Sequence, residues 1–431
     1  MDLPIAHALA RFGLGRRATE PLPADPGAWL RAQLHGPDPA RFAQQPSTAT
    51  GLAALREDRR NKPARGQSRG RAVFRQDATA ELANALVTTA PFRERLVWFW
   101  TNHFTISLRR GQCAAVAGAF VEEAIRPHVT GRFADMLLAV MRHPAMLMYL
   151  DNVGSVGPDS PAGERSHRGL NENLARECME LHTVSPAAGY TQADVTSFAK
   201  VLTGWSIDLR DDPPGFRFRP FAHEPGEQTV MGRHFPPGEE GGVAALQFLA
   251  GHHATHRFLA TKLVRHFVAD DPPADAVGRI AGVLRDTGGN LGAAAAALTT
   301  LDAAWQPQTK LRTPLDFVVA TLRALDAPPP QADQPYLIGS LAGLGQPMWT
   351  APQPNGWPDR ATDWASPEAL VRRIDWSYAV AGRLSGPDPA DVAEASLGPM
   401  LQPATLEAMH HAGSRRDALT LLLSSPEFQR R

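Results

Sequence analysis

The sequence predicts a mainly α-helical fold, built as one large multi-helix domain or as two closely packed helical domains. Apolar residues recur at three- and four-residue intervals over most of the chain, which is the spacing of one face of a helix. Only the region around residues 216–235 alternates apolar and polar side chains as a strand does, so one short β-hairpin is expected there. With 431 residues, 43% of them hydrophobic and 20% charged, the chain can bury a sizeable core.

Three segments are expected along the chain. Residues 1–55 form an N-terminal helical segment, because two apolar-periodic stretches, IAHALARFGLG and PGAWLRAQLHG, each end at a glycine, which is a helix stop signal. Residues 56–77 form a basic flexible connector, since REDRRNKPARGQSRGR is poor in apolar residues and broken by Gly and Pro. No aromatic residue is interleaved there to stack on bases, which disfavours nucleic-acid binding. Residues 78–431 form the main helical domain, with a subdivision near 236–250 left open.

Three local features of the main domain can be predicted. Residues 153–169 form a Gly/Pro/Ser-rich loop, and such loops often carry functional groups. Thr191 is expected to be the N-cap of a helix, with Asp194 as the acid of a capping box. The hairpin is expected to pair GFRFRPF with QTVMGRHF across the turn AHEPGE.

Composition excludes several classes of protein. The net charge is close to zero, so no polyanionic partner is indicated for the chain as a whole. Two cysteines, Cys113 and Cys178, are too few for a disulfide scaffold or a cysteine-rich zinc site. The most apolar run is interrupted by Arg142, His143 and Pro144 and falls short of a membrane span. The N-terminus has no secretory signal pattern, so a cytoplasmic protein is expected, or one exported with a signal-bearing partner.

The segment NENLARECMELHTV, residues 171–184, holds the main candidate site. On a regular helix its polar side chains share an arc of about 140°, opposite an apolar side made by Leu174, Cys178 and Leu181. The members of this polar face are Glu172, Asn173, Arg176, Glu177 and Glu180, with His182 at its margin.

Two interpretations of this polar face are open. It could be a solvent-exposed face in which Arg176 pairs with Glu172 and Glu180, four residues away on either side. It could instead be an active-site face, where Arg176 keeps those two carboxylates ionised. Glu177, which has no such arginine partner, would then be tuned as an acid.

Other candidates are single histidines and tryptophans. His103 ends an aromatic-rich helix and is either a core histidine bonded to a backbone carbonyl or a general base or metal ligand; Asn102 beside it could hold an oxyanion or a sugar hydroxyl. His223 and Glu224 are expected at the solvent-facing hairpin tip. Three tryptophans near Gly or Pro in loops could cover the core or stack on sugar rings, namely Trp205, Trp357 and Trp364. Metal-ligand candidates are His103, His182, His223 and His253, although no spacing such as His-Glu-x-x-His is present.

The phrase NENLARECMELHTVSPAAGYTQADVTSFAKVLTGW resembles the signature of a bacterial family, domain of unknown function 1800. Further motifs along nearly the whole chain are similar to those of the same family, including RERLVWFWTNHFTIS, KLRTPLDFVVATLRAL, PQPNGWPDRATDW and the terminal SSPEF. Departures from the family pattern are Glu224 in place of aspartate, His253-Ala254 in place of His-Pro, and His182 where many relatives have phenylalanine.

The resemblance implies a mostly helical protein without an assigned activity. Members of this family are often exported and tend to be encoded beside proteins of a second uncharacterised family, domain of unknown function 1501, which resembles alkaline phosphatases and sulfatases. The pairing implies a two-component system that acts on an envelope or extracellular polymer.

The favoured function is hydrolysis of a carbohydrate-type polymer or glycoconjugate. Two carboxylates of the 172–180 helix would act as acid and base or nucleophile, with Arg176 holding one ionised and His103, Tyr190 or His223 assisting proton transfer. A variant is β-elimination from a uronate. The residues expected to line the substrate groove are Asn102, Asn173, Trp205, His223, Trp357 and Trp364.

Two alternatives remain open. One is a non-catalytic binding or co-export partner of a protein of the 1501 family. The other is a metal-dependent enzyme with a His/Glu site and a divalent metal, which the leading hypothesis does not require. A concave pocket converging on Glu177, Glu180 and His103 favours an enzyme, whereas a flat apolar patch rimmed by arginine favours a partner protein.

Overall fold

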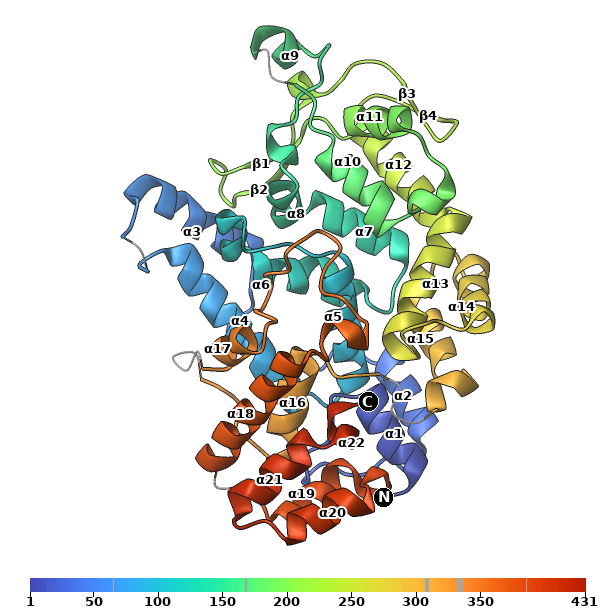
Figure 1. Ribbon diagram of the computed structural model, residues 1–431. Coiled ribbons are helices and arrows are strands. Elements are labelled where there is room, and N and C mark those ends of the chain that lie inside the picture. The colour runs from blue at the N-terminus through green and yellow to red at the C-terminus, as the bar shows by residue number, and fades with distance from the viewer. Residues whose placement is uncertain (65, 167–168, 307–309, 332–335, 385) are drawn as a thin grey trace.

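The computed structural model describes residues 1–431 except 65, 167–168, 307–309, 332–335 and 385, and it confirms a mainly α-helical fold. Figure 1 shows an elongated molecule, with the C-terminal helices at one end and α9 with the β-hairpins at the other. The two termini lie close together, where the guanidinium of Arg431 donates to the carbonyl of Arg11 over 3.2 Å. No helix in the described ranges has the length and apolar character that a membrane span needs.

The helices follow one another in three groups. The N-terminal group comprises α1 (Leu3–Arg11), α2 (Pro26–His35), α3 (Thr48–Asn61), α4 (Arg69–Val87) and α5 (Pro91–His103). The middle group comprises α6 (Ala117–Phe120), α7 (Phe133–Arg142), α8 (Pro144–Tyr149), α9 (Pro161–Ser166), α10 (Asn173–Glu177), α11 (Gln192–Val201), α12 (Glu239–Gly251), α13 (His253–Phe267), α14 (Ala274–Asp286) and α15 (Leu291–Leu298). The C-terminal group comprises α16 (Pro314–Ala324), α17 (Tyr336–Gly343), α18 (Pro367–Arg383), α19 (Pro389–Ser396), α20 (Pro403–His410), α21 (Arg415–Ser424) and α22 (Pro426–Gln429).

Short helices of other windings join these elements. Two are π-helical turns, η2 (Val121–Ile125) and η5 (Cys178–His182). The others are 3₁₀ turns, namely η1 (Gly111–Ala115), η3 (Arg126–His128), η4 (Asn152–Gly154), η6 (Pro186–Ala188), η7 (Pro220–Ala222), η8 (Asp302–Trp305), η9 (Ala361–Asp363) and η10 (Gly398–Met400).

Side-chain caps explain where many helices begin. The predicted capping box forms at α11: the hydroxyl of Thr191 accepts from the Asp194 backbone amide, and the Asp194 carboxylate accepts from the Thr191 amide. Asp2, Asp25 and Ser366 also cap helices, each one or two residues before a proline in the first turn, where a missing N–H costs no hydrogen bond.

The core consists of two hydrophobic clusters. The first runs from α1 and α2 to α15, and the second joins α1 and α4 to the C-terminal helices. Ala8 of α1 belongs to the first cluster and Ala6 to the second, so residues 1–55 are built into the main body of the protein. The boundary considered near 236–250 falls on α12, which packs inside the first cluster through Leu246 and Leu249.

The basic stretch 56–77 is mostly helical, which corrects the expected flexible connector. Residues 56–61 complete α3, and 69–77 begin α4. The Asp58 carboxylate closes the turn between them, since it accepts from the Ser68 hydroxyl and from the amides of Arg69 and Gly70. Arginine and glutamate are good helix formers, and this propensity outweighs their lack of apolar periodicity.

The expected strand pairing also needs correction, because the region holds two hairpins. β1 (Trp205–Asp208) pairs antiparallel with β2 (Gly215–Phe218), and β3 (Gln228–Val230) pairs antiparallel with β4 (Arg233–Phe235). The turn of the second hairpin is Met231-Gly232, where both residues have positive φ as a type I′ turn requires. Methionine is unusual at a position with positive φ, so this turn could hardly be predicted from residue types.

Candidate functional site

The candidate helix begins two residues later than expected and changes its winding halfway. α10 covers Asn173–Glu177, and the chain continues as the π-helical η5. A π turn is wider than an α turn, so the spacing of 100° per residue does not hold beyond Glu177. Single π turns inside helices are often found at functional sites.

Glu172 and Arg176 tie α10 to α11. The Glu172 carboxylate accepts from Arg176 Nη2 over 2.7 Å, from Gln192 Nε2 over 2.9 Å and from Thr196 Oγ1 over 2.6 Å. The hydrogen bond from Thr196, followed by that from Gln192 and the charge of Arg176, holds the pKa of Glu172 below its ordinary value. Glu172 is therefore an ionised structural link between two helices. Asn173 is half-buried at the first position of α10.

Glu177 and Glu180 are half-buried, and their surroundings differ from those of Glu172. Among the described residues, neither carboxylate takes part in a hydrogen bond or an ion pair, because Arg176 is engaged by Glu172 and Gln192. Burial, and after it the charge of Glu180, raises the pKa of Glu177, against the opposing charge of Arg176. Glu177 therefore keeps its proton up to a higher pH than an exposed glutamate does.

Two tyrosines lie within the electrostatic reach of this carboxylate pair. Burial and then the charge of Glu180 raise the pKa of Tyr190. Burial raises the pKa of Tyr149 to about 12, with smaller contributions from Cys113 and from Glu177. We call Tyr149, Glu177, Glu180 and Tyr190 the Glu177 cluster. The sequence did not single out Tyr149, because it ends an apolar helix and looks like a core residue.

His103 and His182 lie in the aromatic core. His103 Nε2 is 3.1 Å from the backbone carbonyl oxygen of His182, and its ring contacts Phe104 with centroids 4.5 Å apart. The His182 side chain has 0% exposure, and within the described residues neither of its ring nitrogens has a hydrogen-bond partner. Burial lowers the pKa of His182 to about 3 and that of His103 well below its ordinary value. Both rings are neutral packing groups, and this burial gives no support to proton transfer by His103.

His223 and Glu224 are buried, which corrects the expectation of a solvent-facing hairpin tip. His223 Nδ1 is 2.9 Å from the Thr203 carbonyl oxygen, and its Nε2 accepts from the Gly238 amide over 2.7 Å. Glu224 forms a 2.8 Å ion pair with Lys200 and accepts from the amide of Asp159. Glu224 thereby anchors the first part of the 153–169 loop to the segment that follows β2. Residues 167–168 of this loop lie outside the described residues.

The histidines proposed as metal ligands do not converge. His103 and His182 are adjacent in the core, His223 lies beside β2, and His253 is exposed at the first residue of α13. In the described part of the chain, no group of three or more His, Cys, Asp or Glu side chains could hold a metal ion. The structure therefore offers no support for the metal-dependent interpretation.

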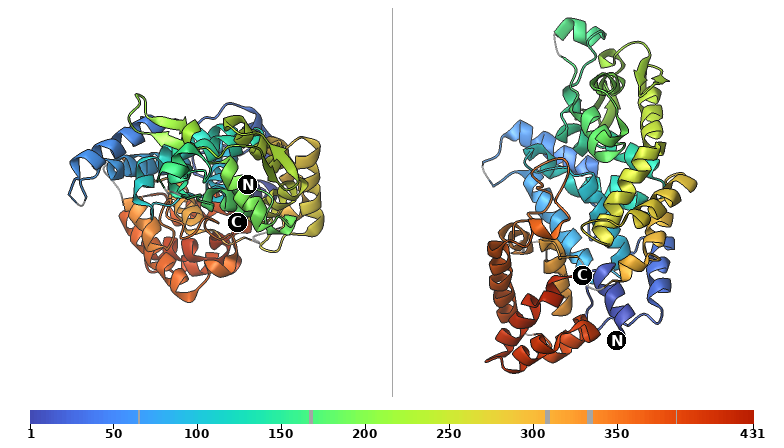
Figure 2. Two further views of the ribbon diagram at one scale, coloured as in Figure 1. Left: turned by 90° about the horizontal axis from the view of Figure 1, so that it is seen from above. Right: turned by 45° about the vertical axis from the view of Figure 1, so that its right-hand side comes forward.

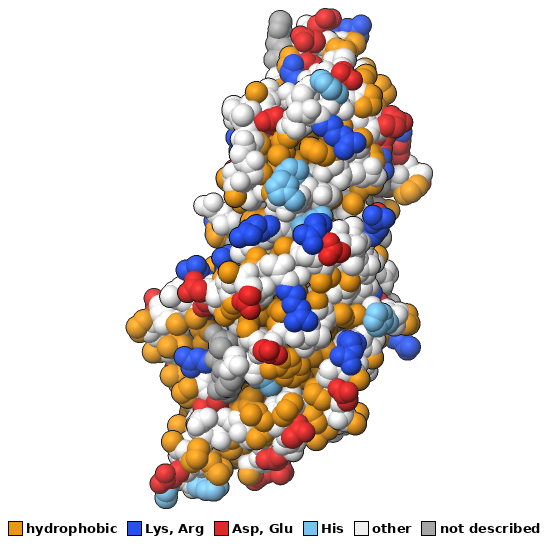
Figure 3. All heavy atoms as spheres, turned by 90° about the vertical axis from the view of Figure 1, so that its right-hand side faces the viewer, with side chains coloured by type: hydrophobic (Ala, Val, Ile, Leu, Met, Phe, Trp, Pro, Cys, Tyr) orange, Lys and Arg blue, Asp and Glu red, His pale blue; other side chains and the backbone are white. Residues whose placement is uncertain are grey.

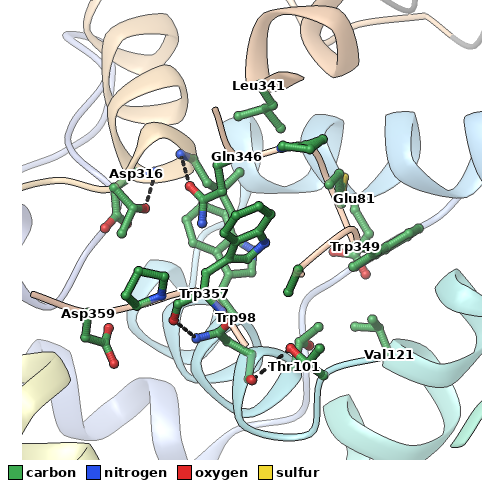
Figure 4. Close-up of a pocket in the computed structure, with 18 of the residues that line it drawn as sticks. Glu81, Trp98, Thr101, Val121, Asp316, Leu341, Gln346, Trp349, Trp357 and Asp359 are labelled. Carbon is green, nitrogen blue, oxygen red and sulfur yellow. Dashed lines mark hydrogen bonds between the residues drawn. The ribbon is translucent and has the colours of Figure 1, made fainter. Parts of the chain in front are cut away.

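A pocket of about 110 Å³ lies between α4, α5, α16 and the loop that follows α17. Trp98, Trp349 and Trp357 line it, as Figure 4 shows. Asn102 uses both ends of its amide on Trp357: Nδ2 donates to the carbonyl over 2.8 Å, and Oδ1 accepts from the amide over 2.7 Å. Asn102 thus holds the loop in place, and its amide is already occupied. The pocket is not lined by Glu177, Glu180 or His103.

The other two candidate tryptophans are core residues. Trp205 is buried beneath the guanidinium of Arg142, 5.5 Å from its ring centre. Trp364 is buried behind Trp357 and donates through Nε1 to the Pro358 carbonyl over 2.9 Å. Of the three, only Trp357 lines a pocket in which a ligand could stack on it.

The same pocket contains polar pairs that the sequence did not reveal. His266 Nδ1 is 2.7 Å from a carboxylate oxygen of Asp359, and Arg95 pairs with Asp316 over 2.6 Å. The partners in each pair lie more than ninety residues apart, so no local spacing could have indicated them.

A family model described as "Protein of unknown function (DUF1800)" matches residues 7–430, so the chain belongs to this family. No curated protein and no solved structure matches this chain.

Proposed function

We propose that this DUF1800 protein cleaves a carbohydrate-type polymer or glycoconjugate, with Glu177 as the proton donor. The observation that carries the proposal is the half-buried Glu177 carboxyl, which has a raised pKa, a second carboxylate beside it and no hydrogen bond or ion pair within the described residues. A general acid at a glycosidic oxygen must carry its proton, and burial beside a second carboxylate raises the pKa of Glu177 in the direction that favours the protonated form.

Glu180 is the second carboxylate of the proposed mechanism. In glycoside hydrolysis this group acts either as a nucleophile or as a base that activates water. Carboxyl groups about 5–5.5 Å apart retain the configuration at the anomeric carbon, and groups about 6.5–9.5 Å apart invert it. Tyr190 is the proposed assistant in proton transfer, because the charges of both glutamates act on its hydroxyl. His103, Glu172 and Arg176 have no catalytic part, because their polar groups are buried or already paired.

The test uses Glu177→Gln and Glu180→Gln with a panel of neutral and acidic polysaccharides, measured by release of reducing ends. Each variant should lose about 10²-fold or more of the wild-type rate, as expected for loss of acid–base groups. Glu240→Gln, on an exposed position of α12, is the matched control and should keep full activity. Thermal unfolding followed by circular dichroism checks that each variant is folded.

A pH profile sharpens the assignment to Glu177. Activity that needs a protonated Glu177 falls as the pH rises through its raised pKa, and Glu177→Gln removes this alkaline limb. Wild-type rates in folded Glu177→Gln and Glu180→Gln would rule out the carboxylate mechanism.

A second candidate function is that of a binding partner, and one surface favours it. Val371, Ile374 and Tyr378 of α18 are 54%, 45% and 44% exposed and recur at helical spacing, so they form one apolar stripe. The guanidinium of Arg416 lies 3.4 Å from the centre of the Tyr378 ring. An exposed apolar face beside arginine is suited to another protein, and a neighbouring protein of the 1501 family is the proposed partner. Co-elution of the two proteins in gel filtration, lost in Ile374→Glu but kept in Glu240→Gln, is the expected result.

A further inference from the structure

A groove runs between the C-terminal half of α3 and the β1–β2 hairpin and continues along the loop that begins at residue 153. It consists of two adjoining hollows of about 750 and 400 Å³. Both are lined by Val153, Gly154, Arg219 and Phe221, so they form one continuous trough. The volumes fall within or near the range of about 300–1,000 Å³ that is usual for ligand sites, and the open shape suits a chain.

The lining of this groove is strongly basic in a protein without net charge. Five arginines line it, against the carboxylates of Asp151 and Asp208; the arginines are Arg59, Arg165, Arg210, Arg217 and Arg219. By contrast, basic and acidic side chains are interspersed on the face of the molecule that Figure 3 shows.

Most of these guanidinium groups remain available to a ligand. Arg165 and Arg210 are exposed and have no ion pair within the described residues. Arg59 donates to the neutral amide of Gln112 over 3.1 Å, and Arg219 donates to a backbone carbonyl. Among the five arginines, Arg217 alone is paired with carboxylates of described residues, those of Asp208 and Asp211. Arginine binds carboxylate, sulfate and phosphate groups with two parallel hydrogen bonds, so the groove is suited to a chain with repeated anionic groups.

The other lining groups favour a sugar chain over a nucleic acid. Phe221 is 60% exposed at the groove and offers one aromatic face for a sugar ring. Asp151 and Asp208 can accept hydrogen bonds from the hydroxyl groups that a sugar chain carries on every ring. Single-stranded nucleic acids are usually held by several stacking residues in succession, and Phe221 is the only aromatic side chain that lines this groove within the described residues.

Residues beside the groove also influence the Glu177 cluster electrostatically. Met148 and Asp151 line the groove, and Tyr149 lies between them in the sequence. Arg110 pairs with Asp151 over 2.6 Å, and the charges of both Arg110 and Glu177 act on the Tyr149 hydroxyl. Arg110 thus interacts both with a carboxylate that lines the groove and with Tyr149 of the Glu177 cluster.

We propose that this arginine groove binds an anionic polysaccharide, held through its carboxylate or sulfate groups. The carbohydrate nature of the ligand rests on the proposed function, whereas its negative charge and its position rest on the groove itself. Arg59 belongs to the basic stretch that follows residue 55, and in this proposal it contributes to ligand binding because it lines the groove.

The test is a binding measurement by isothermal titration calorimetry with the full chain and four probes: polygalacturonate, dextran sulfate, neutral dextran and single-stranded DNA. Wild-type protein should bind at least one of the two anionic polysaccharides at least tenfold more tightly than dextran and DNA. A preference for polygalacturonate identifies a carboxylate ligand, and a preference for dextran sulfate a sulfate ligand. Arg59→Gln/Arg210→Gln should weaken this binding at least tenfold. Arg257→Gln/Arg279→Gln, at exposed positions of α13 and α14, should not change it.

Several results would overturn the inference. These are no binding of either anionic polysaccharide, DNA binding at least as tight as theirs, and undiminished binding by Arg59→Gln/Arg210→Gln. Glu177→Gln separates this inference from the catalytic proposal, because it should bind the polysaccharide with wild-type affinity while losing cleavage. Normal cleavage by Glu177→Gln with intact groove binding would remove only the catalytic assignment. Suppose instead that a neutral polymer is cleaved in a Glu177-dependent reaction and that Arg59→Gln/Arg210→Gln binds as tightly as the wild-type protein. This result would refute the role of the groove and leave the catalytic proposal intact.

Discussion

Replacing His182 with phenylalanine should make the protein more resistant to acid. The His182 ring is fully buried against Phe104, with ring centroids 5.2 Å apart, and no partner in the described structure bonds its nitrogens. Burial lowers its pKa to about 3, so the folded protein keeps this ring neutral down to about that pH. The unfolded chain protonates it below its ordinary pKa of about 6.5. The unfolded state therefore gains stability relative to the folded state as the pH falls below about 6.5.

The size of this effect follows from the two pKa values. One pKa unit corresponds to about 1.4 kcal/mol, so protonation of His182 in the unfolded chain costs about 0.2 kcal/mol of stability at pH 7 and about 2 kcal/mol at pH 5. Phenylalanine does not titrate and removes this loss. It also removes two buried nitrogens without partners and alters the packing, but these contributions do not depend on pH.

Urea unfolding at pH 7, 6 and 5 measures the difference. Between pH 7 and pH 5 the wild-type protein should lose about 2 kcal/mol more than His182→Phe. His410→Phe, at an exposed position, is the control and should follow the wild-type protein. Parallel losses in wild type and His182→Phe would refute the reasoning, because they would mean that the folded state also protonates this ring or that unfolding leaves it buried.

Two further substitutions test other contacts. Arg126→Met should cost about 3–5 kcal/mol in urea unfolding, because it leaves the buried carboxylates of Glu81, Glu94 and Glu122 without their shared cation. Stability close to that of the wild-type protein at pH 7 would contradict this expectation. Gly356→Ala should cost about 1–3 kcal/mol and change the tryptophan fluorescence, since the position has a φ of +81° and an added Cβ would lie 2.3 Å from the carbonyl oxygen of Asn102. Gly339→Ala, with open space around it inside helix α17, should cause no loss of stability and no change in fluorescence.

The sequence predicted the fold class because helix formation leaves local signs. Apolar periodicity marked the helices, and the Thr191–Asp194 capping box was predicted and found, since both residues of a cap lie within one turn. Strand pairing was predicted less well. The run GFRF has the alternation of a strand, but its partner is Trp205–Asp208, which reads as a buried segment at the end of a helix.

Burial of polar side chains was the weakest part of the prediction. His103 and His223 are attractive catalytic candidates by residue type, yet their ring nitrogens bond backbone atoms seventy-nine and twenty positions away in the chain. A sequence pattern places a residue on a face of an element. It does not specify what covers that face.

The sequence by itself determined that the chain is mainly helical and that Thr191 and Asp194 cap a helix. The tertiary structure decided that Glu172 is tied to α11, while Glu177 has no hydrogen bond or ion pair with any described residue. It also assembled the arginine groove from segments as distant as Arg59 and Arg217. The physical reason is that the interactions involved act over different distances along the chain. Backbone hydrogen bonds and caps act within a few residues, whereas desolvation and charge depend on which distant segments the packed core brings together.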